Sequence, residues 1–278
     1  MTRTHEDNDQ IRRLFAGNIK RREERIDLAL ACLLIAKAEY PRISIEEYLM
    51  RLDQLAFDLQ VEVDREGDAF KVARDIGAFL GGLHEFRGNP DDFYDPRNSY
   101  LSDVIDRRLG IPISLGVVYI EVARRAGVQL LPVSFPGHFL VKLARDGSEA
   151  FIDAFGGGRV LDRDGCGRLL EAQFGESAVF SDSMLGAATK RQVITRALQN
   201  LKAIYVHANE PDKALQIVDF LTVVAPWDLD QIRDRGLLYG HLGRTDAAVA
   251  DLETFVQHAP PGPEVESARD VLRRIASR

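Results

Sequence analysis

The sequence has few of the features that mark secreted or metal-binding proteins. It contains two cysteines among 278 residues, Cys32 in an apolar helical stretch and Cys166 in a glycine-rich segment. Two thiols so far apart form neither a disulfide framework nor a metal-ligand cluster. We therefore expect structural thiols, no bound metal and no cofactor.

Long apolar runs and an apolar leader are also lacking. The longest apolar run, residues 28–36, is about half the roughly 18 residues that a membrane-spanning helix requires. Residues 1–13 carry acidic side chains where a signal peptide has an apolar stretch. These absences predict a cytoplasmic protein that does not interact with membranes.

No large excess of one charge is present. The formal net charge of -7 is modest, and Lys and Arg residues are interspersed with Asp and Glu. Nucleic acids and anionic membranes require a concentrated basic surface, which this pattern does not predict. With 278 residues and 45% hydrophobic content, the chain can bury a large core and a smaller one, so we expect two modules.

Helical periodicity dominates the first hundred residues. Residues 1–20 are polar, and we expect a flexible N-terminus there. Three helices are predicted next: an apolar one ending near Pro41, an amphipathic one opened by Ser44, and one over residues 69–86. Residues 86–99 are rich in turn formers and aromatics, which indicates an ordered loop of the kind that borders functional sites.

Short β-rich runs follow a predicted helix over residues 114–126. They cover residues 128–135, 138–143 and 150–155, with turn-forming dipeptides between them. Asp146-Gly147, between the second and third runs, is a hairpin signal and predicts that these two strands are antiparallel neighbours. Helices followed by a small antiparallel sheet predict an α+β domain.

The C-terminal part repeats itself at an offset of 34 residues. This offset aligns residues 204–215 with residues 238–249, matching Tyr, His, Asp and Ala, and pairs Pro226 with Pro260. A helix-turn-helix unit of this period is a tetratricopeptide signature. About two units are present, fewer than the three that an independent solenoid needs. The module therefore either supports the first domain by packing against it or presents a groove for a peptide.

Three polar residues have the order and setting of a nucleophile, a base and an orienting acid. Ser114 lies at a predicted helix start, His138 at the start of a strand and Asp153 within the next strand. A helix N-terminus favours developing negative charge, and a hairpin can place His and Asp side chains next to each other. Each residue also has an ordinary structural alternative, as a helix cap, a structural donor or a turn residue.

Two residues of the loop over 86–99 are candidates for lining the same cleft. Tyr94 and Asn98 carry polar groups that can form hydrogen bonds with a ligand there. The alternative is that Asn98 caps the following helix while Tyr94 packs beneath it.

Six motifs extend around these candidate residues. They are Arg87-Gly88-Asn89, Phe93-Tyr94-Asp95-Pro96, Asn98-Ser99-Tyr100-Leu101, residues 108–115, Pro136-Gly137-His138-Phe139-Leu140-Val141 and Ile152-Asp153-Ala154-Phe155-Gly156-Gly157. Together they resemble the bacterial SirB-type family of transglutaminase-like proteins with tetratricopeptide repeats. The resemblance implies a papain/transglutaminase-like core over residues 21–185, N-terminal helices included, and all-α tetratricopeptide helices over residues 190–278.

The resemblance also implies roles for the three polar residues. In active transglutaminase-like enzymes a cysteine begins the helix, and histidine and aspartate follow on adjacent strands. Ser114 then stands at the cysteine position, with His138 and Asp153 at the other two. Serine ionises much less readily than a thiol, whose pKa of about 8.5 is lowered further by a helix end and a histidine. Transglutaminase activity is therefore not expected.

Three functions remain open from the sequence. The preferred one is a regulatory protein of little or no catalytic activity, whose cleft binds a protein or peptide. The second is a serine hydrolase of peptide, amide or ester bonds, with Ser114 as nucleophile, His138 as base and Asp153 as orienter. The third is a structural scaffold in which the same three side chains hold loops together.

Overall fold

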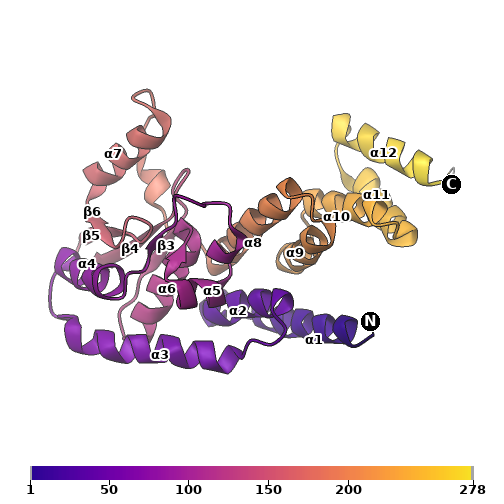
Figure 1. Ribbon diagram of the computed structural model, residues 1–278. Helices are drawn as coiled ribbons and strands as arrows, with labels where there is room; N and C mark the ends of the chain where they lie inside the picture. The colour runs from indigo at the N-terminus through magenta and orange to yellow at the C-terminus, as the bar shows by residue number, and fades with distance from the viewer. Residues whose placement is uncertain (1, 277–278) are drawn as a thin grey trace. The chain divides into compact units, whose positions relative to one another are not determined.

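A computed structural model describes residues 2–276 of the chain (Figure 1). The chain forms two compact units. The first, called the sheet unit here, consists of Lys20–Ala197. The second, called the repeat unit, consists of Met1–Ile19 together with Leu198–Arg278. The boundary between them falls inside helix α8 (Lys190–His207).

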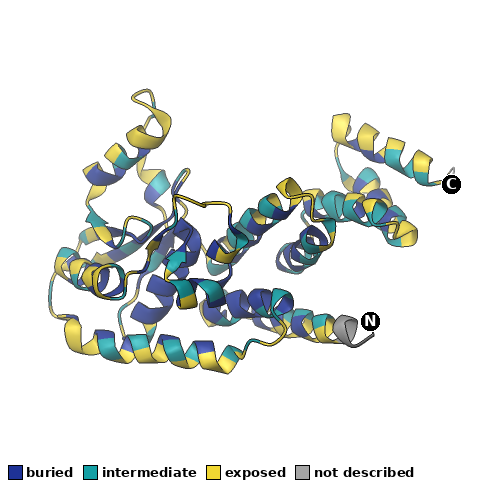
Figure 2. Cartoon of the chain, viewed as in Figure 1, coloured by how far each residue is buried: buried dark blue, intermediate teal, exposed yellow. Residues whose placement is uncertain are grey.

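The helices of the sheet unit precede and follow a small sheet. They are α2 (Leu28–Glu39), α3 (Ile45–Glu62), α4 (Ala69–Gly77), α5 (Leu101–Arg107), α6 (Pro112–Arg125) and α7 (Arg163–Phe174). The predicted N-cap Ser44 is confirmed, because its hydroxyl accepts a hydrogen bond from the Glu47 amide of α3 at 3.2 Å. Helices α2 and α6 are buried on nearly all sides (Figure 2), which explains their almost continuous apolar sequence.

The main sheet contains four antiparallel strands in chain order. They are β3 (Leu131–Val133), β4 (Leu140–Arg145), β5 (Ser148–Asp153) and β6 (Arg159–Leu161). The predicted hairpin is confirmed: β4 pairs with β5, and Asp146 and Gly147 form its turn with φ of 50° and 77°. A separate parallel pair joins β1 (Arg87–Gly88) to β2 (Leu109–Gly110). The sheet unit is therefore α+β, as the sequence predicts.

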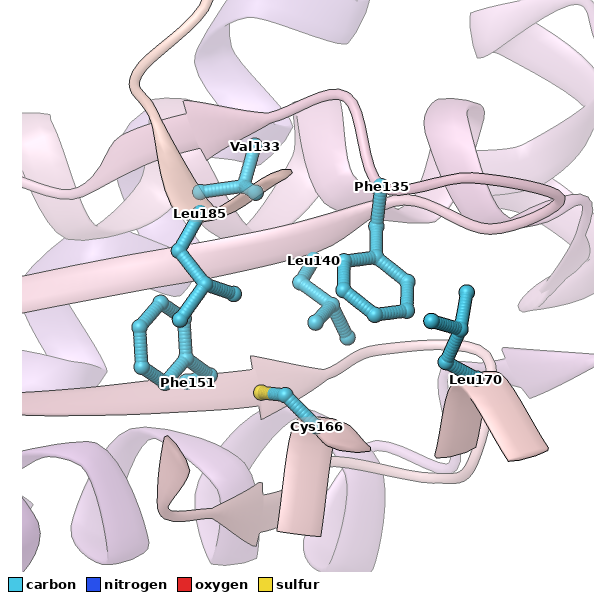
Figure 3. Close-up of a cluster of buried hydrophobic side chains, with 7 residues drawn as sticks. All are labelled: Val133, Phe135, Leu140, Phe151, Cys166, Leu170 and Leu185. Atoms are coloured by element: carbon cyan, nitrogen blue, oxygen red, sulfur yellow. The ribbon is translucent and has the colours of Figure 1, made fainter. Parts of the chain in front are cut away.

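Alternating side chains bury both faces of the sheet. On one face Phe139 packs against α6, where Gly116 has no side chain to obstruct the ring. The other face is covered by α7 and by the short helical turn Asp182–Leu185. Figure 3 shows that cluster, formed by Val133, Phe135, Leu140, Phe151, Cys166, Leu170 and Leu185. The loops at the end of this doubly covered sheet are thereby held in place.

The repeat unit shows the 34-residue period directly. Its helices besides the end of α8 are α1 (Thr2–Ile19), α9 (Pro211–Val224), α10 (Leu229–His241), α11 (Thr245–His258) and α12 (Pro263–Ala276). The first and last residues of α9 and α11 differ by 34 positions, as do the last residues of α8 and α10. The helix pairs thus follow the register that the sequence repeat predicts.

Helix α1 is where the structure departs most from the sequence prediction. Residues 1–20 are predicted to be flexible, yet α1 is a regular helix that belongs to the repeat unit. Its buried residues Ile11, Phe15 and Ile19 recur every four positions, and the Phe15 ring meets the Phe220 ring of α9 edge-on at 4.8 Å. This distant partner stabilises a segment whose composition is polar.

Candidate functional site

A cavity of about 520 Å³ lies at the end of the sheet, where α6 begins. Its polar lining consists of His138, Asp153, Arg159 and Gln173. Its apolar walls are supplied by Pro90, Phe93, Pro112, Phe155 and Leu169. Several apolar walls around a few convergent polar groups, with a volume between about 300 and 1,000 Å³, are typical of a ligand site.

The β4–β5 hairpin brings His138 and Asp153 together. His138 lies just before β4, and Asp153 is the last residue of β5, so the register of the two strands places them at the same end of the sheet. The His138 Nε2 atom and the Asp153 Oδ1 atom are 2.8 Å apart and hydrogen-bonded. Their residues are only 5% and 2% exposed, which makes this a buried dyad at the cavity wall.

Three protein groups donate hydrogen bonds to the Asp153 carboxylate. Besides His138, the Gly156 amide donates to Oδ1 at 2.9 Å, and an Arg159 nitrogen donates to Oδ2 at 3.0 Å. Burial on its own raises the pKa of Asp153, but the hydrogen bonds from His138 and Gly156 and the nearby positive charge of Arg159 outweigh it. The pKa of Asp153 is therefore lowered, and the group is ionised at neutral pH.

His138 belongs to the cavity lining and has a second ring nitrogen, Nδ1. In the tautomer whose Nε2–H donates to Asp153, Nδ1 carries a lone pair, and it has no hydrogen-bond partner among the described residues. The backbone holds this ring in place, because the His138 amide donates to the Phe135 carbonyl and the His138 carbonyl accepts from Arg196 at 2.7 Å. In that tautomer, His138 can accept a hydrogen bond from a ligand.

Ser114 takes no part in this dyad. Its hydroxyl donates to the Asn98 carbonyl oxygen at 2.5 Å and accepts from the Ile111 amide at 3.1 Å. Within the described part of the chain it makes no hydrogen bond to His138, and it does not line the cavity. Of the three polar residues that the sequence groups together, the structure joins His138 to Asp153 and places Ser114 in a separate backbone network.

The start of α6 explains this arrangement. The sequence predicts a helix from residue 114, whereas α6 begins at Pro112, two residues earlier. An α-helix turns by about 100° per residue, so Pro112 and Ser114 point in nearly opposite directions, and Pro112 faces the cavity. The preference of proline for the first helical position is the sequence signal that indicates this start.

The loop over residues 86–99 contributes different residues from those predicted. Asn98 is fully buried, and its side-chain amide donates to the Asp92 carbonyl at 2.6 Å, so it organises the loop from inside. Tyr94 is 74% exposed and is not part of the cavity lining. Its neighbour Phe93 lines the cavity instead and meets the Phe155 ring edge-on at 6.0 Å.

Arg159 is the polar lining residue with the weakest sequence signal. It lies in β6, a three-residue strand that the sequence pattern does not predict. The glycines at 156–158 are the available clue, because a Cβ atom at Gly158 would lie 2.4 Å from the Gly77 carbonyl oxygen. This close backbone approach of the loop to α4 lets β6 return to the sheet with Arg159 beside Asp153.

The described residues provide no metal-ligand cluster, no reactive thiol and no helix able to span a membrane. No three His, Cys, Asp or Glu side chains converge on a metal position between residues 2 and 276. Both Cys32 and Cys166 are buried, and burial raises the pKa of each thiol to about 12, so neither is a reactive thiolate. None of the described helices is long and apolar enough to cross a membrane.

Comparison with known proteins identifies the family to which the chain belongs. Residues 46–199 match the transglutaminase-like superfamily, and residues 201–273 match a tetratricopeptide repeat. A UPF0162 protein of Xylella fastidiosa (strain Temecula1) is 37% identical over 254 residues, covering 90% of both chains. UPF0162 protein YchA of Escherichia coli (strain K12) is 29% identical over 250 residues, covering 90% of this chain and 91% of the other.

A eukaryotic protein shares part of this sequence. F-box only protein 21 of Pongo abelii is 31% identical over 190 residues, which cover 64% of this chain and 30% of the other. The superfamily match spans more than half of the chain, and the Xylella protein matches nearly all of it. The chain therefore belongs to the transglutaminase-like superfamily and is related along most of its length to the bacterial UPF0162 proteins.

Proposed function

We propose that the protein binds a segment of another protein in the His138 cavity and has no nucleophile of its own there. The observation that carries this proposal is the position of the Ser114 hydroxyl, which is hydrogen-bonded to the Asn98 carbonyl at 2.5 Å. A catalytic nucleophile must lie within hydrogen-bond reach of its base. The α6 residue that faces the cavity is Pro112, which has no nucleophilic atom.

The domain combination supports a protein as the partner. Tetratricopeptide repeats form extended surfaces that commonly bind other proteins, and here they follow the transglutaminase-like domain in one chain. The apolar walls of the cavity, among them Phe93, Phe155 and Leu169, suit side chains of a polypeptide segment. The SirB-type membership and the cytoplasmic location stay predictions of the sequence and are compatible with this role.

Site-specific photo-crosslinking tests the proposal. We expect a benzophenone amino acid in place of Phe93 to crosslink a protein partner in cells. The same group in place of Phe57, an exposed aromatic residue on α3, is the matched control and should not capture that partner. Leu169→Trp fills the cavity and should abolish the crosslink from position 93. Capture of the same proteins from both positions, or capture unaffected by Leu169→Trp, argues against the proposal.

A serine hydrolase is the second candidate, and the His138–Asp153 hydrogen bond of 2.8 Å favours it. This function requires the Ser114 hydroxyl to leave the Asn98 carbonyl and turn toward the cavity. We expect a fluorophosphonate probe to leave the protein unlabelled. Labelling that disappears in Ser114→Ala would make the hydrolase the better assignment.

A further inference from the structure

The cavity lining contains one carboxylate, that of Asp153, which is already paired, and one guanidinium, that of Arg159, which keeps free hydrogen-bond donors. Both oxygens of Asp153 already accept hydrogen bonds from His138, Gly156 and Arg159. Gln173 also lines the cavity but carries no charge, and its amide nitrogen donates to the Gly137 carbonyl at 3.5 Å. A ligand that supplies acceptor oxygens therefore suits this cavity better than a ligand that supplies a cation.

Arg159 has most of the free hydrogen-bond donors in the cavity lining. One terminal nitrogen of its guanidinium donates to Asp153, and the group makes no other hydrogen bond among the described residues. A guanidinium has five N–H groups in a planar fork that matches a carboxylate. The side chain is 57% exposed, so its remaining donors are open to an entering ligand.

The start of α6 adds positive potential at the same place. Pro112, the first residue of this 14-residue helix, lines the cavity, so the positive end of the α6 dipole lies at the cavity wall. The negative charge of Asp153 is balanced by Arg159 at 3.0 Å. The helix end therefore leaves the cavity favourable to one negative charge.

His138 requires a hydrogen-bond donor from the ligand, not an acceptor. His138 is only 5% exposed and belongs to the cavity lining. In the tautomer whose Nε2–H donates to Asp153, Nδ1 has a lone pair with no partner among the described residues. A carboxylate alone does not satisfy this nitrogen, because both are acceptors. A neighbouring N–H group on the same ligand satisfies it. The C-terminal residue of a polypeptide carries both groups, a carboxylate and the N–H of the last peptide bond.

We propose that the cavity recognises the free C-terminus of a polypeptide. Arg159 and the N-terminal end of α6 receive the terminal carboxylate, and His138 Nδ1 accepts a hydrogen bond from the last amide N–H. Phe93, Phe155 and Leu169 surround an apolar last side chain. This inference rests on the proposed function and specifies which segment of the partner enters the cavity.

Two matched pools of fluorescent peptides test the inference by anisotropy with the full-length protein. Both pools have random sequences with an apolar last residue; one ends in a free carboxylate and the other in a carboxamide. We expect the acid pool to bind at least about tenfold more tightly, the ratio that one charge-assisted hydrogen bond of roughly 1.4 kcal/mol provides. Arg159→Gln should remove this preference, and its binding of the amide pool reports that the cavity is intact.

Arg168→Gln is the control for the loss of an arginine. Arg168 lies on α7, is exposed and does not line the cavity, so this variant should keep the full preference for the acid pool. A third pool, N-methylated at the last peptide bond, should bind about tenfold more weakly than the acid pool because Nδ1 of His138 loses its donor.

The possible outcomes separate this inference from the proposed function. Equal binding of acid and amide pools, both blocked by Leu169→Trp, overturns C-terminal recognition while segment binding stands. Tight binding of an amidated pool that ends in Asp assigns the carboxylate to a side chain and also overturns the inference. Binding of neither pool overturns it too, and the crosslink from position 93 then decides independently whether any segment enters the cavity.

Discussion

At the scale of single residues, the first turn of α6 determines which side chain faces His138. Pro112 lines the cavity, and Ser114 is turned away and hydrogen-bonded to backbone groups. The first turn of α6 therefore offers two positions for a nucleophile. Position 112 faces the cavity but holds a proline, whereas position 114 holds a serine that is turned away from it. Cysteine substitutions distinguish these positions chemically.

Pro112→Cys should produce a reactive thiol, whereas Ser114→Cys should not. A thiol at position 112 lies at a helix N-terminus and lines the same cavity as His138, and a helix N-terminus and a nearby histidine both lower a thiol pKa. We expect iodoacetamide to alkylate Pro112→Cys at least about tenfold faster than Ser114→Cys. Mass spectrometry of the modified protein over time measures both rates. The native Cys32 and Cys166 contribute little background because they are buried. Faster alkylation of Ser114→Cys contradicts the assignment of the cavity position.

Asp153→Asn tests the buried dyad through stability. The amide keeps the shape of the side chain but cannot satisfy His138, Gly156 and Arg159 together. We expect the free energy of unfolding at neutral pH to fall by about 1–3 kcal/mol, measured by urea denaturation. Asp146→Asn is the control, because Asp146 is an exposed turn residue with φ of 50°, which asparagine adopts readily.

The difference in stability between wild type and Asp153→Asn should be smaller at acidic pH. The folded state lowers the pKa of Asp153 below its ordinary value of 3.8, so ionisation stabilises the fold above that pH. This contribution is lost as the pH falls through the lowered folded-state pKa, where wild-type Asp153 becomes protonated. The stability difference between wild type and Asp153→Asn should therefore shrink below about pH 3.8. A difference that stays constant into that range contradicts a carboxylate held in its ionised form.

At the scale of elements, a glycine-lined contact positions the loop that carries Arg159. Gly77 at the end of α4 and Gly81 in the following π-helical turn (Ala78–Leu83) lie four residues apart. A Cβ atom on either would meet a backbone oxygen, that of Gly158 at 2.1 Å or that of Gly157 at 2.0 Å. The helix and the loop therefore touch backbone to backbone, just after Asp153.

Gly81→Ala and Gly82→Ala form a matched test of this contact. Gly81→Ala forces the loop away and should lower the free energy of unfolding by about 1–3 kcal/mol, as overpacking does. Gly82 has no atom within 4 Å of its added Cβ, so Gly82→Ala should be neutral or slightly stabilising. Urea denaturation of both variants measures the difference. Equal effects of the two changes would mean that the loop can move away from α4 without loss of stability.

Local signals account for the elements that were predicted from the sequence. The β4–β5 hairpin follows from Asp146-Gly147, a dipeptide suited to positive φ, and its register then brings His138 close to Asp153. The orientation of Ser114 was not predictable in this way. It depends on the Asn98 carbonyl, 16 positions earlier, and on a loop whose path is set by tertiary contacts.

At the scale of the whole molecule, α1 shows how a distant partner determines structure. The spacing of Ile11, Phe15 and Ile19 is helical, but the polar composition of residues 1–20 outweighs it in a sequence-based prediction. The burial of Phe15 against Phe220 supplies the missing stabilisation. The match of α9 and α11 to one period, by contrast, is visible in the sequence because each repeat carries its own pattern.

Phe15→Ala and Leu14→Ala test the packing of α1. Phe15 is fully buried, so its truncation should lower the free energy of unfolding by about 3–5 kcal/mol and increase hydrogen exchange in α9. Leu14 is exposed, and Leu14→Ala should change stability by less than about 0.5 kcal/mol. Similar exchange in α9 for the two variants contradicts the packing of α1 on that helix.

The pairing of α1 with α9 also has a consequence for synthesis on the ribosome. About two hundred residues separate Phe15 from Phe220, and translation adds roughly 5–20 residues per second. The apolar stripe of α1 therefore leaves the ribosome about 10–40 s before its partner exists. During that interval the apolar stripe of α1 lacks the surface that buries it, so a helix made well before α9 must wait for α9 to reach its native contacts.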